Sequence, residues 1–179
     1  MQIYEALKKD HEELRSLLNE LVSLSENDES RGSELIKQIR DELIPHARAE
    51  ESVFYNSMRS LDAAKEIVMD GYKEHMEAET LLRSLQAMDK INADWTSTAK
   101  KLREDLEHHI KEEEGKIFNV AKQLFTDEEA TMMCEAFEKL KPEVREEGFM
   151  QNTLDLIANV MPPRFASSIR AASTSNPQV

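Results

Sequence analysis

The sequence predicts an all-α protein: an up-down-up-down four-helix bundle with one or two extra helices at its C-terminal end. Three observations support this fold class. The 179 residues include only four glycines and five prolines, and aromatic residues make up 6% of the chain. Residues that favour helices, such as Leu, Glu, Lys and Ala, dominate the composition. Apolar residues also recur every three or four positions over long stretches, which is the spacing of one helix face.

Four long helices are predicted, at about residues 2–24, 34–58, 63–88 and 94–125. In the first, Leu7, Leu14 and Leu18 share a face, and the polar stretch "SENDESRGS" ends the helix. In the second, Pro45 removes a backbone donor, so we expect a kink or a restart there. Because the connections between these amphipathic helices are short, neighbouring helices should run antiparallel.

The chain beyond the bundle is expected to divide into two parts. Thr126 and Glu129 form a capping-box pattern that begins a shorter fifth helix, and "MQNTLDLIANV" is a candidate sixth. We therefore predict a bundle over 1–125, a helical extension over 126–161, and a tail over 162–179. The tail has little to bury and should be disordered. The segment from Lys141 to Met161 could cap one bundle end or pair with a second copy, so a monomer and a homodimer both remain open.

Composition excludes several classes of protein. The formal net charge of −13 argues against nucleic acid or an anionic membrane surface as a partner. No apolar run is long enough to span a membrane, and the N-terminal residues do not form a signal peptide. We therefore expect a soluble, cytoplasmic protein. A single cysteine, Cys134, excludes an internal disulfide and a cysteine-based metal site.

Four histidines fall on the apolar faces of the four predicted helices. His11 stands alone in the first, while each of the other three is followed by a glutamate four residues later. Residues four apart on a helix lie on the same face. These pairs are His46 with Glu50, His75 with Glu79, and His109 with Glu113.

The fourth helix offers two registers, because His108 with Glu112 has the same spacing. The stripe that contains His109 and Glu113 also contains Leu102, Leu106 and Ile117, whereas the stripe of His108 is wholly polar. His109 should therefore face the core and His108 the solvent. The segments "HARAEESVFY" and "HIKEEEGKIF" also echo each other, which suggests that the second and fourth helices have equivalent roles about a pseudo-two-fold axis.

A metal site explains this pattern better than a polar core does. A single His-x-x-x-Glu pair is weak evidence in so acidic a chain. Four imidazoles and three carboxylates buried together, however, would cost many kcal/mol without compensation. Cations supply that compensation, and a set of nitrogen and carboxylate ligands suits iron, manganese or zinc better than magnesium or calcium.

The motif elements "KKDHEEL", "IPHARAEESVFY", "KEHMEAE" and "HHIKEEEGKIF" resemble those of the hemerythrin-like proteins, the HHE cation-binding domain. The resemblance covers roughly residues 1–125 and implies a four-helix bundle around a non-haem di-iron centre with an oxo or hydroxo bridge. It implies that His11 and His46 ligate one iron, that His75 and His109 ligate the other, and that Glu50 and Glu113 bridge the two.

Glu79 departs from the pattern of the oxygen-carrying hemerythrins, which place a second histidine at this position. As an anionic ligand it would favour ferric over ferrous iron and so disfavour reversible O2 carriage. The alternative is that Glu79 accepts a hydrogen bond from a histidine without touching the metal. With Glu79 as a ligand, the protein and the bridge fill all but one of about twelve coordination positions. The open position falls on the iron held by His11 and His46.

Two function classes follow from the resemblance. The first is a redox or stress-defence protein that reacts with O2, peroxide or NO, which would make it an oxidoreductase. The second is a carrier or sensor that binds O2, NO or iron without turnover. Ferritin-like storage is disfavoured, because that plan uses Glu-x-x-His spacing. The sequence does not decide whether the protein is an enzyme, and the expected partner is a small diatomic molecule or peroxide.

Overall fold

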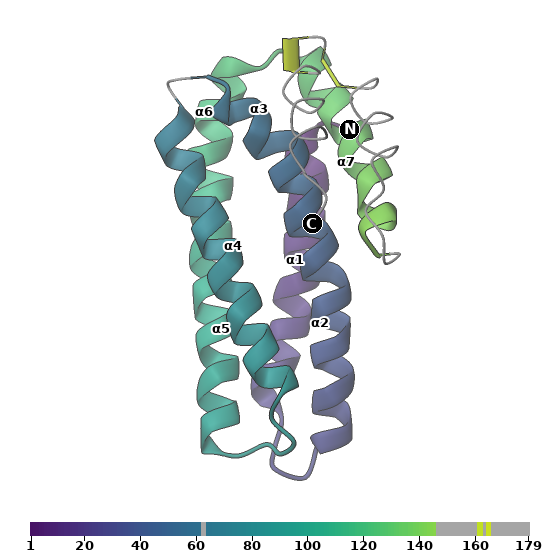
Figure 1. Cartoon of the computed structure of the whole chain (residues 1–179), viewed down its shortest axis with the longest axis vertical. Coiled ribbons are helices and arrows are strands. Elements are labelled where there is room, and N and C mark those ends of the chain that lie inside the picture. Colours follow the sequence, from purple (N-terminus) through teal and green to yellow (C-terminus); the bar gives the residue numbers. More distant parts are fainter. Residues whose placement is uncertain (62–63, 146–160, 163, 166–179) are drawn as a thin grey trace, which may run out of the picture.

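The structure is a computed structural model, and it describes residues 1–61, 64–145, 161–162 and 164–165. Four long helices stand side by side and alternate in direction, as the sequence predicts (Figure 1). They are α1 (Ile3–Ser23), α2 (Glu29–Glu50), α4 (Lys65–Gln86) and α5 (Ala93–Glu112). The all-α bundle prediction is therefore confirmed for the described residues.

Two of these helices are extended by irregular turns at the upper end of the bundle in Figure 1. A π-helical turn, η1 (Glu51–Tyr55), and a short helix, α3 (Asn56–Arg59), continue α2. A second π-helical turn, η3 (Glu113–Ile117), and α6 (Phe118–Leu124) continue α5. In a π turn each hydrogen bond spans five residues, so one extra residue is inserted, and such turns are frequent at functional sites.

The second helix differs from the prediction in two ways. It begins at Glu29, so the polar residues expected in a loop form its first turns, and Gly32 packs there beside Trp95 of α5. It also continues through Pro45 without the restart that was one of the two expected outcomes, and an irregular turn follows later, in η1. We attribute this continuity to packing, because the neighbours Leu43 and Ala47 are both buried and hold the helix on either side of the proline.

The apolar core is divided into two clusters. The upper cluster includes Leu7, Val53, Phe54, Phe118 and Phe137. The lower cluster includes Leu18, Ile39, Leu82, Trp95 and Leu102. Between them each long helix contributes a buried histidine, so a polar layer separates two apolar regions.

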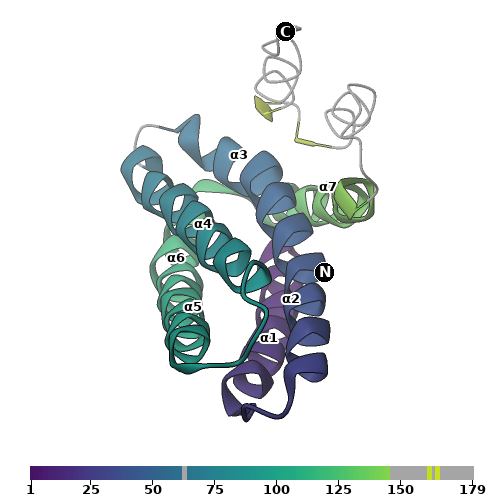
Figure 2. The same ribbon diagram turned by 60° about the horizontal axis from the view of Figure 1, so that its bottom comes forward.

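The fifth helix, α7 (Asp127–Arg145), packs outside the bundle against α1 and α2. Figure 2 shows it on the side of the bundle away from α5. Its predicted capping box is present: the Thr126 N–H donates to Glu129 Oε2 at 2.9 Å, and the Glu129 N–H donates to Thr126 Oγ1 at 3.2 Å. The candidate sixth helix, at residues 150–160, lies outside the described residues.

Part of the predicted tail packs on the bundle. Phe165 is buried and its ring lies edge-on to that of Phe125, 5.3 Å between centroids. Arg164 donates to both carboxylate oxygens of Glu129 and to the Leu124 carbonyl. These contacts differ from the expectation that the chain from residue 162 has little to bury. Among the described residues, no helix is both long and apolar enough to cross a membrane.

Candidate metal centre

Six of the seven predicted ligands meet in the polar layer between the two clusters. Each is at most 2% exposed, so all of them are buried away from bulk solvent. The six are His11 from α1, His46 and Glu50 from α2, His75 from α4, His109 from α5 and Glu113 from η3.

The carboxylates of Glu50 and Glu113 lie at the middle of this layer. Glu50 Oε2 is 3.5 Å from His46 Nε2 and 3.4 Å from His75 Nε2. Glu113 Oε2 is 3.2 Å from His11 Nε2 and 3.8 Å from His109 Nε2. Each carboxylate therefore contacts one histidine on its own helix stretch and one from another helix, which is an arrangement suited to a bridge.

The imidazoles form two pairs. The ring centroids of His11 and His46 are 5.1 Å apart, and those of His75 and His109 are 4.6 Å apart. These are the pairs that the family resemblance assigns to the two metals. In the second pair the Nε2 atoms approach to 3.1 Å, and with Glu50 these side chains offer three ligand atoms within 4.8 Å of one another.

The opposite ring nitrogen of every one of these histidines meets a carboxylate. His11 Nδ1 is 3.0 Å from Glu114, and His46 Nδ1 is 3.0 Å from Asp10. His75 Nδ1 is 3.0 Å from Glu51, and His109 Nδ1 is 2.8 Å from Glu74. Such contacts fix the tautomer and aim the Nε2 lone pair inward, as metal-binding histidines require.

These four carboxylates face basic groups in turn. Arg15 contacts Glu114 at 3.1 Å, and Arg48 contacts Glu51 at 3.2 Å. Lys141 of α7 donates to Asp10 Oδ2 at 2.6 Å, and His108 Nε2 lies 3.9 Å from Glu74.

Glu79 lies apart from the six. It is buried, at 8% exposed, but its Oε1 lies 2.5 Å from Arg48 Nη2, and its Oε2 lies 3.9 Å from Arg83. Within the described residues its ion pairs are therefore with arginines, and its role as a metal ligand stays a prediction. Binding a cation through Glu79 would require the ion pair with Arg48 to break.

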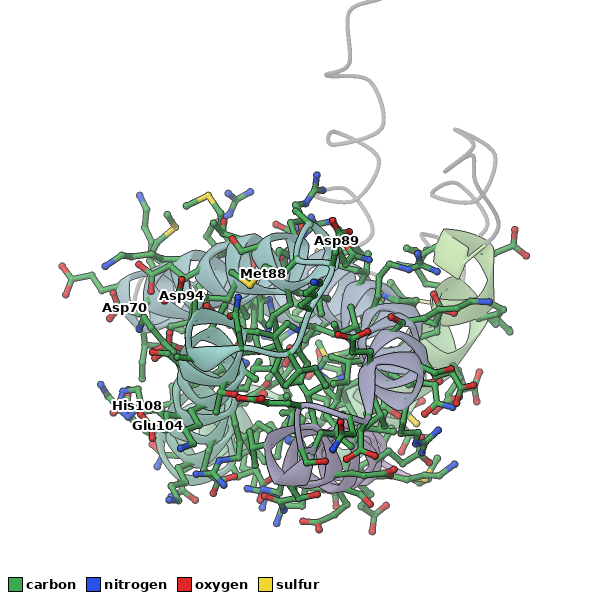
Figure 3. The ribbon with its side chains drawn as sticks, turned by 90° about the horizontal axis from the view of Figure 1, so that it is seen from below. Asp70, Met88, Asp89, Asp94, Glu104 and His108 are labelled. Atoms are coloured by element: carbon green, nitrogen blue, oxygen red, sulfur yellow. The ribbon has the colours of Figure 1, made fainter. Side chains whose placement is uncertain are left out.

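The register of the fourth helix follows the apolar stripe. His109 is 2% exposed, whereas the side chain of His108 is 68% exposed. Figure 3 shows His108 beside Glu104 on the outer side of the bundle. His108 therefore lies near the outer side of Glu74 and does not reach the polar layer.

Several buried atoms in the layer have no hydrogen-bond partner. They are His11 Nε2 and all four carboxylate oxygens of Glu50 and Glu113. Leaving buried polar atoms unsatisfied costs about 1–3 kcal/mol each, and more for charged groups. A chemically consistent occupant must therefore accept electron pairs from nitrogen and oxygen together, and a cation does so.

The pKa directions support a cation as well. Burial and the neighbouring Glu50 carboxylate raise the pKa of Glu113 well above its usual range. Burial lowers the pKa of His11 and of His75, but their glutamate contacts outweigh it and raise these pKa values to about 9 and about 10. Burial lowers the pKa of His109 to about 4. These directions indicate carboxylate charge without a balancing cation in the layer, and metal binding would be coupled to the release of protons.

The sequence reasoning missed the four carboxylates that hold the histidines. A signal for them exists: Asp10 and Glu74 come directly before a histidine, and Glu51 and Glu114 come directly after a glutamate of the layer. An adjacent residue on a helix lies at the flank of the stripe, where it can contact the next helix.

Fold and site together indicate a cation-binding helical bundle, with histidine and carboxylate side chains buried between two apolar clusters. Residues 2–121 match the hemerythrin HHE cation-binding domain, and the chain belongs to that family.

Two relatives are similar to this chain over most of its length. The chain is 28% identical over 142 residues to an uncharacterized hemerythrin-like protein of Schizosaccharomyces pombe, covering 78% of this chain and 69% of that protein. It is 25% identical over 146 residues to a DNA nickase of Nostoc sp., covering 82% of this chain but only 41% of the nickase. No solved structure matches significantly.

Proposed function

We propose that the polar layer holds two iron ions and that the protein reacts there with O2, peroxide or NO in redox or stress-defence chemistry. One observation carries this proposal: Glu50 and Glu113 are fully buried, have no hydrogen-bond partner, and each contacts a histidine of both pairs. Two cations, one in each histidine pair, would satisfy all of these atoms at once.

In this proposal His11 and His46 hold one ion, His75 and His109 hold the other, and Glu50 and Glu113 contact both. When bound, the iron pair would supply electrons to a small oxidant, and a separate reductant would return the iron to the ferrous state. The chain's own residues orient the ligands and exclude water. Because each of the six ligands is at most 2% exposed, only a small molecule would reach the ions, which favours O2, peroxide and NO over an organic substrate.

Glu79 remains the seventh member of the proposed ligand set, but unlike the other six it is paired with an arginine. Its ion pair with Arg48 competes with binding to a metal ion. If it binds iron, it adds a negative charge that favours the ferric state and turnover. If it stays on Arg48, the site keeps a neutral nitrogen-rich half, which favours the alternative function, a carrier or sensor of O2, NO or iron.

DNA cleavage is not part of the proposal. The chain covers less than half of the nickase, and a net charge of −13 opposes approach to a phosphate backbone.

The deciding experiment begins with anaerobic loading of the purified chain with ferrous iron, followed by a count of ions per chain. We expect two ions and, after oxidation, a near-ultraviolet absorption band of ferric iron. The loaded protein is then mixed with O2 and, separately, with peroxide. Consumption that continues beyond one equivalent when a chemical reductant is supplied supports the redox function, whereas uptake that reverses on purging supports the carrier. Binding of one zinc ion in place of two irons would refute the di-iron centre.

A further inference from the structure

The outer contacts of the metal centre include one group from outside the family-matched segment. Asp10 Oδ2 contacts His46 Nδ1 at 3.0 Å and accepts a hydrogen bond from Lys141 Nζ at 2.6 Å. The Asp10 side chain is 7% exposed and that of Lys141 is 15% exposed, so solvent screens this pair only weakly. Lys141 belongs to α7, and residues 2–121 are those that match the family.

The same helix also covers the His46 ring. The Phe137 ring lies edge-on to His46 with 5.9 Å between centroids and an interplanar angle of 86°, and Phe137 is completely buried. The Lys141 ammonium lies 5.4 Å from the Phe137 centroid, within the range of a cation–π contact. Phe137, Lys141 and Asp10 thus form one connected set of contacts around a single imidazole.

The other three histidines are held differently. The carboxylates that contact them, Glu114, Glu51 and Glu74, face Arg15, Arg48 and His108 respectively. All three basic groups lie within residues 2–121. Within the described ranges, α7 therefore supplies the cation for the His46 contact alone.

We infer that α7 is a working part of the metal centre, in which Lys141 acts through Asp10 as a positioning residue for His46. This inference rests on the proposed metal centre. Lys141 holds the Asp10 carboxylate in the place where it can fix the His46 tautomer and aim Nε2 toward Glu50. Its positive charge also draws electron density from the carboxylate, which makes His46 a weaker donor and favours the reduced metal.

A purely structural reading is that the Lys141–Asp10 pair only fastens α7 to the bundle. The two readings differ in what they predict for the loaded protein. A fastening pair changes the free energy of unfolding, whereas a positioning pair also changes the metal affinity and the reduction potential.

The test uses Lys141→Met, which keeps the length of the side chain and removes its charge, and Lys141→Arg, which restores the charge. Lys139→Met is the matched control, because Lys139 is exposed on the same helix. Ferrous iron affinity is measured anaerobically against a chelator, alongside the reduction potential and the melting temperature of the metal-free protein. We expect Lys141→Met to weaken the binding of one of the two ions by about tenfold and to lower the potential. Lys141→Arg should restore both, and Lys139→Met should change neither.

A second variant keeps the test valid if Lys141→Met folds poorly. Asp10→Asn should weaken the same ion, and adding Lys141→Met to it should cause no further loss of affinity, because coupled residues are not additive. If Lys141→Met lowers only the melting temperature, the inference is wrong, and the Lys141–Asp10 pair only holds α7 against the bundle. If the wild type itself binds no iron, the proposed function fails instead.

Discussion

The half of the centre formed by His11 and His46 resembles the half formed by His75 and His109 on the inside and differs from it on the outside. Inside, each imidazole Nε2 lies 3.2–3.8 Å from Glu50 or Glu113. Outside, Asp10, which contacts His46, receives a short hydrogen bond from Lys141, whereas Glu74, which contacts His109, faces the exposed His108 at 3.9 Å. The repeated motif thus determines where the ligands lie, while the elements that pack around it determine what surrounds them.

The largest expected effect is the loss of metal from one half of the centre. His109→Ala should remove at least one metal ion per chain, because it deletes a buried ligand. His108→Ala should leave both ions in place, because His108 lies outside the layer. The measurement is iron content after anaerobic loading, with both variants prepared in parallel. Equal loss of iron in the two variants would show that the inward register has no bearing on metal binding.

The next effect compares the halves through equivalent contacts. Glu51 holds His75 and Glu114 holds His11, each at 3.0 Å. Glu51→Gln and Glu114→Gln keep the shape but exchange the carboxylate for a neutral amide, so each should weaken metal binding by about 10–100-fold. Titration against a chelator gives the two affinities. Losses of similar size would mean that the halves are equivalent at this level, and a loss confined to one variant would mean that they are not.

The smallest effect concerns the position that breaks the symmetry. Glu79→Gln removes the charge that pairs with Arg48, whose side chain is 43% exposed. If Glu79 serves only that partly solvated pair, the free energy of unfolding should change by about 1 kcal/mol or less, with the reduction potential unchanged. A raised potential in the variant would instead show that Glu79 acts on the metal. Thermal unfolding and a redox titration on the same samples distinguish the two outcomes.

The sequence predicts the fold and the burial of the inner histidines and glutamates, because both follow from periodicity. The stripe through Leu7, His11 and Leu14 identifies a buried helix face and the polar residue within it. Periodicity along one helix does not report what the neighbouring helix offers. The contacts of Glu79 with Arg48 and of Asp10 with Lys141 were therefore missed.

That α2 does not restart at Pro45 follows from packing as well. A local rule predicts the cost of the proline, whereas the packing that outweighs this cost comes from residues distant in the sequence. The π turns η1 and η3 also fall outside a simple apolar pattern, because each inserts a residue and shifts the helix face that follows. Beyond η3, Ala121 and Phe125 are buried, whereas Val120 and Leu124, one position earlier in each case, are only partly buried.

Trp95 provides a spectroscopic view of the lower cluster. It is the single tryptophan of the chain and is 3% exposed, with Gly32 beside its ring. The lower cluster contains none of the proposed ligands. The fluorescence of Trp95 therefore reports how tightly the lower cluster, remote from the proposed ligands, is packed in samples with or without iron. Emission that stays blue-shifted after chelation would mean that apolar packing alone assembles the helices and that the metal is added to a finished scaffold. Emission that shifts to the red would mean that the scaffold and its metal assemble together.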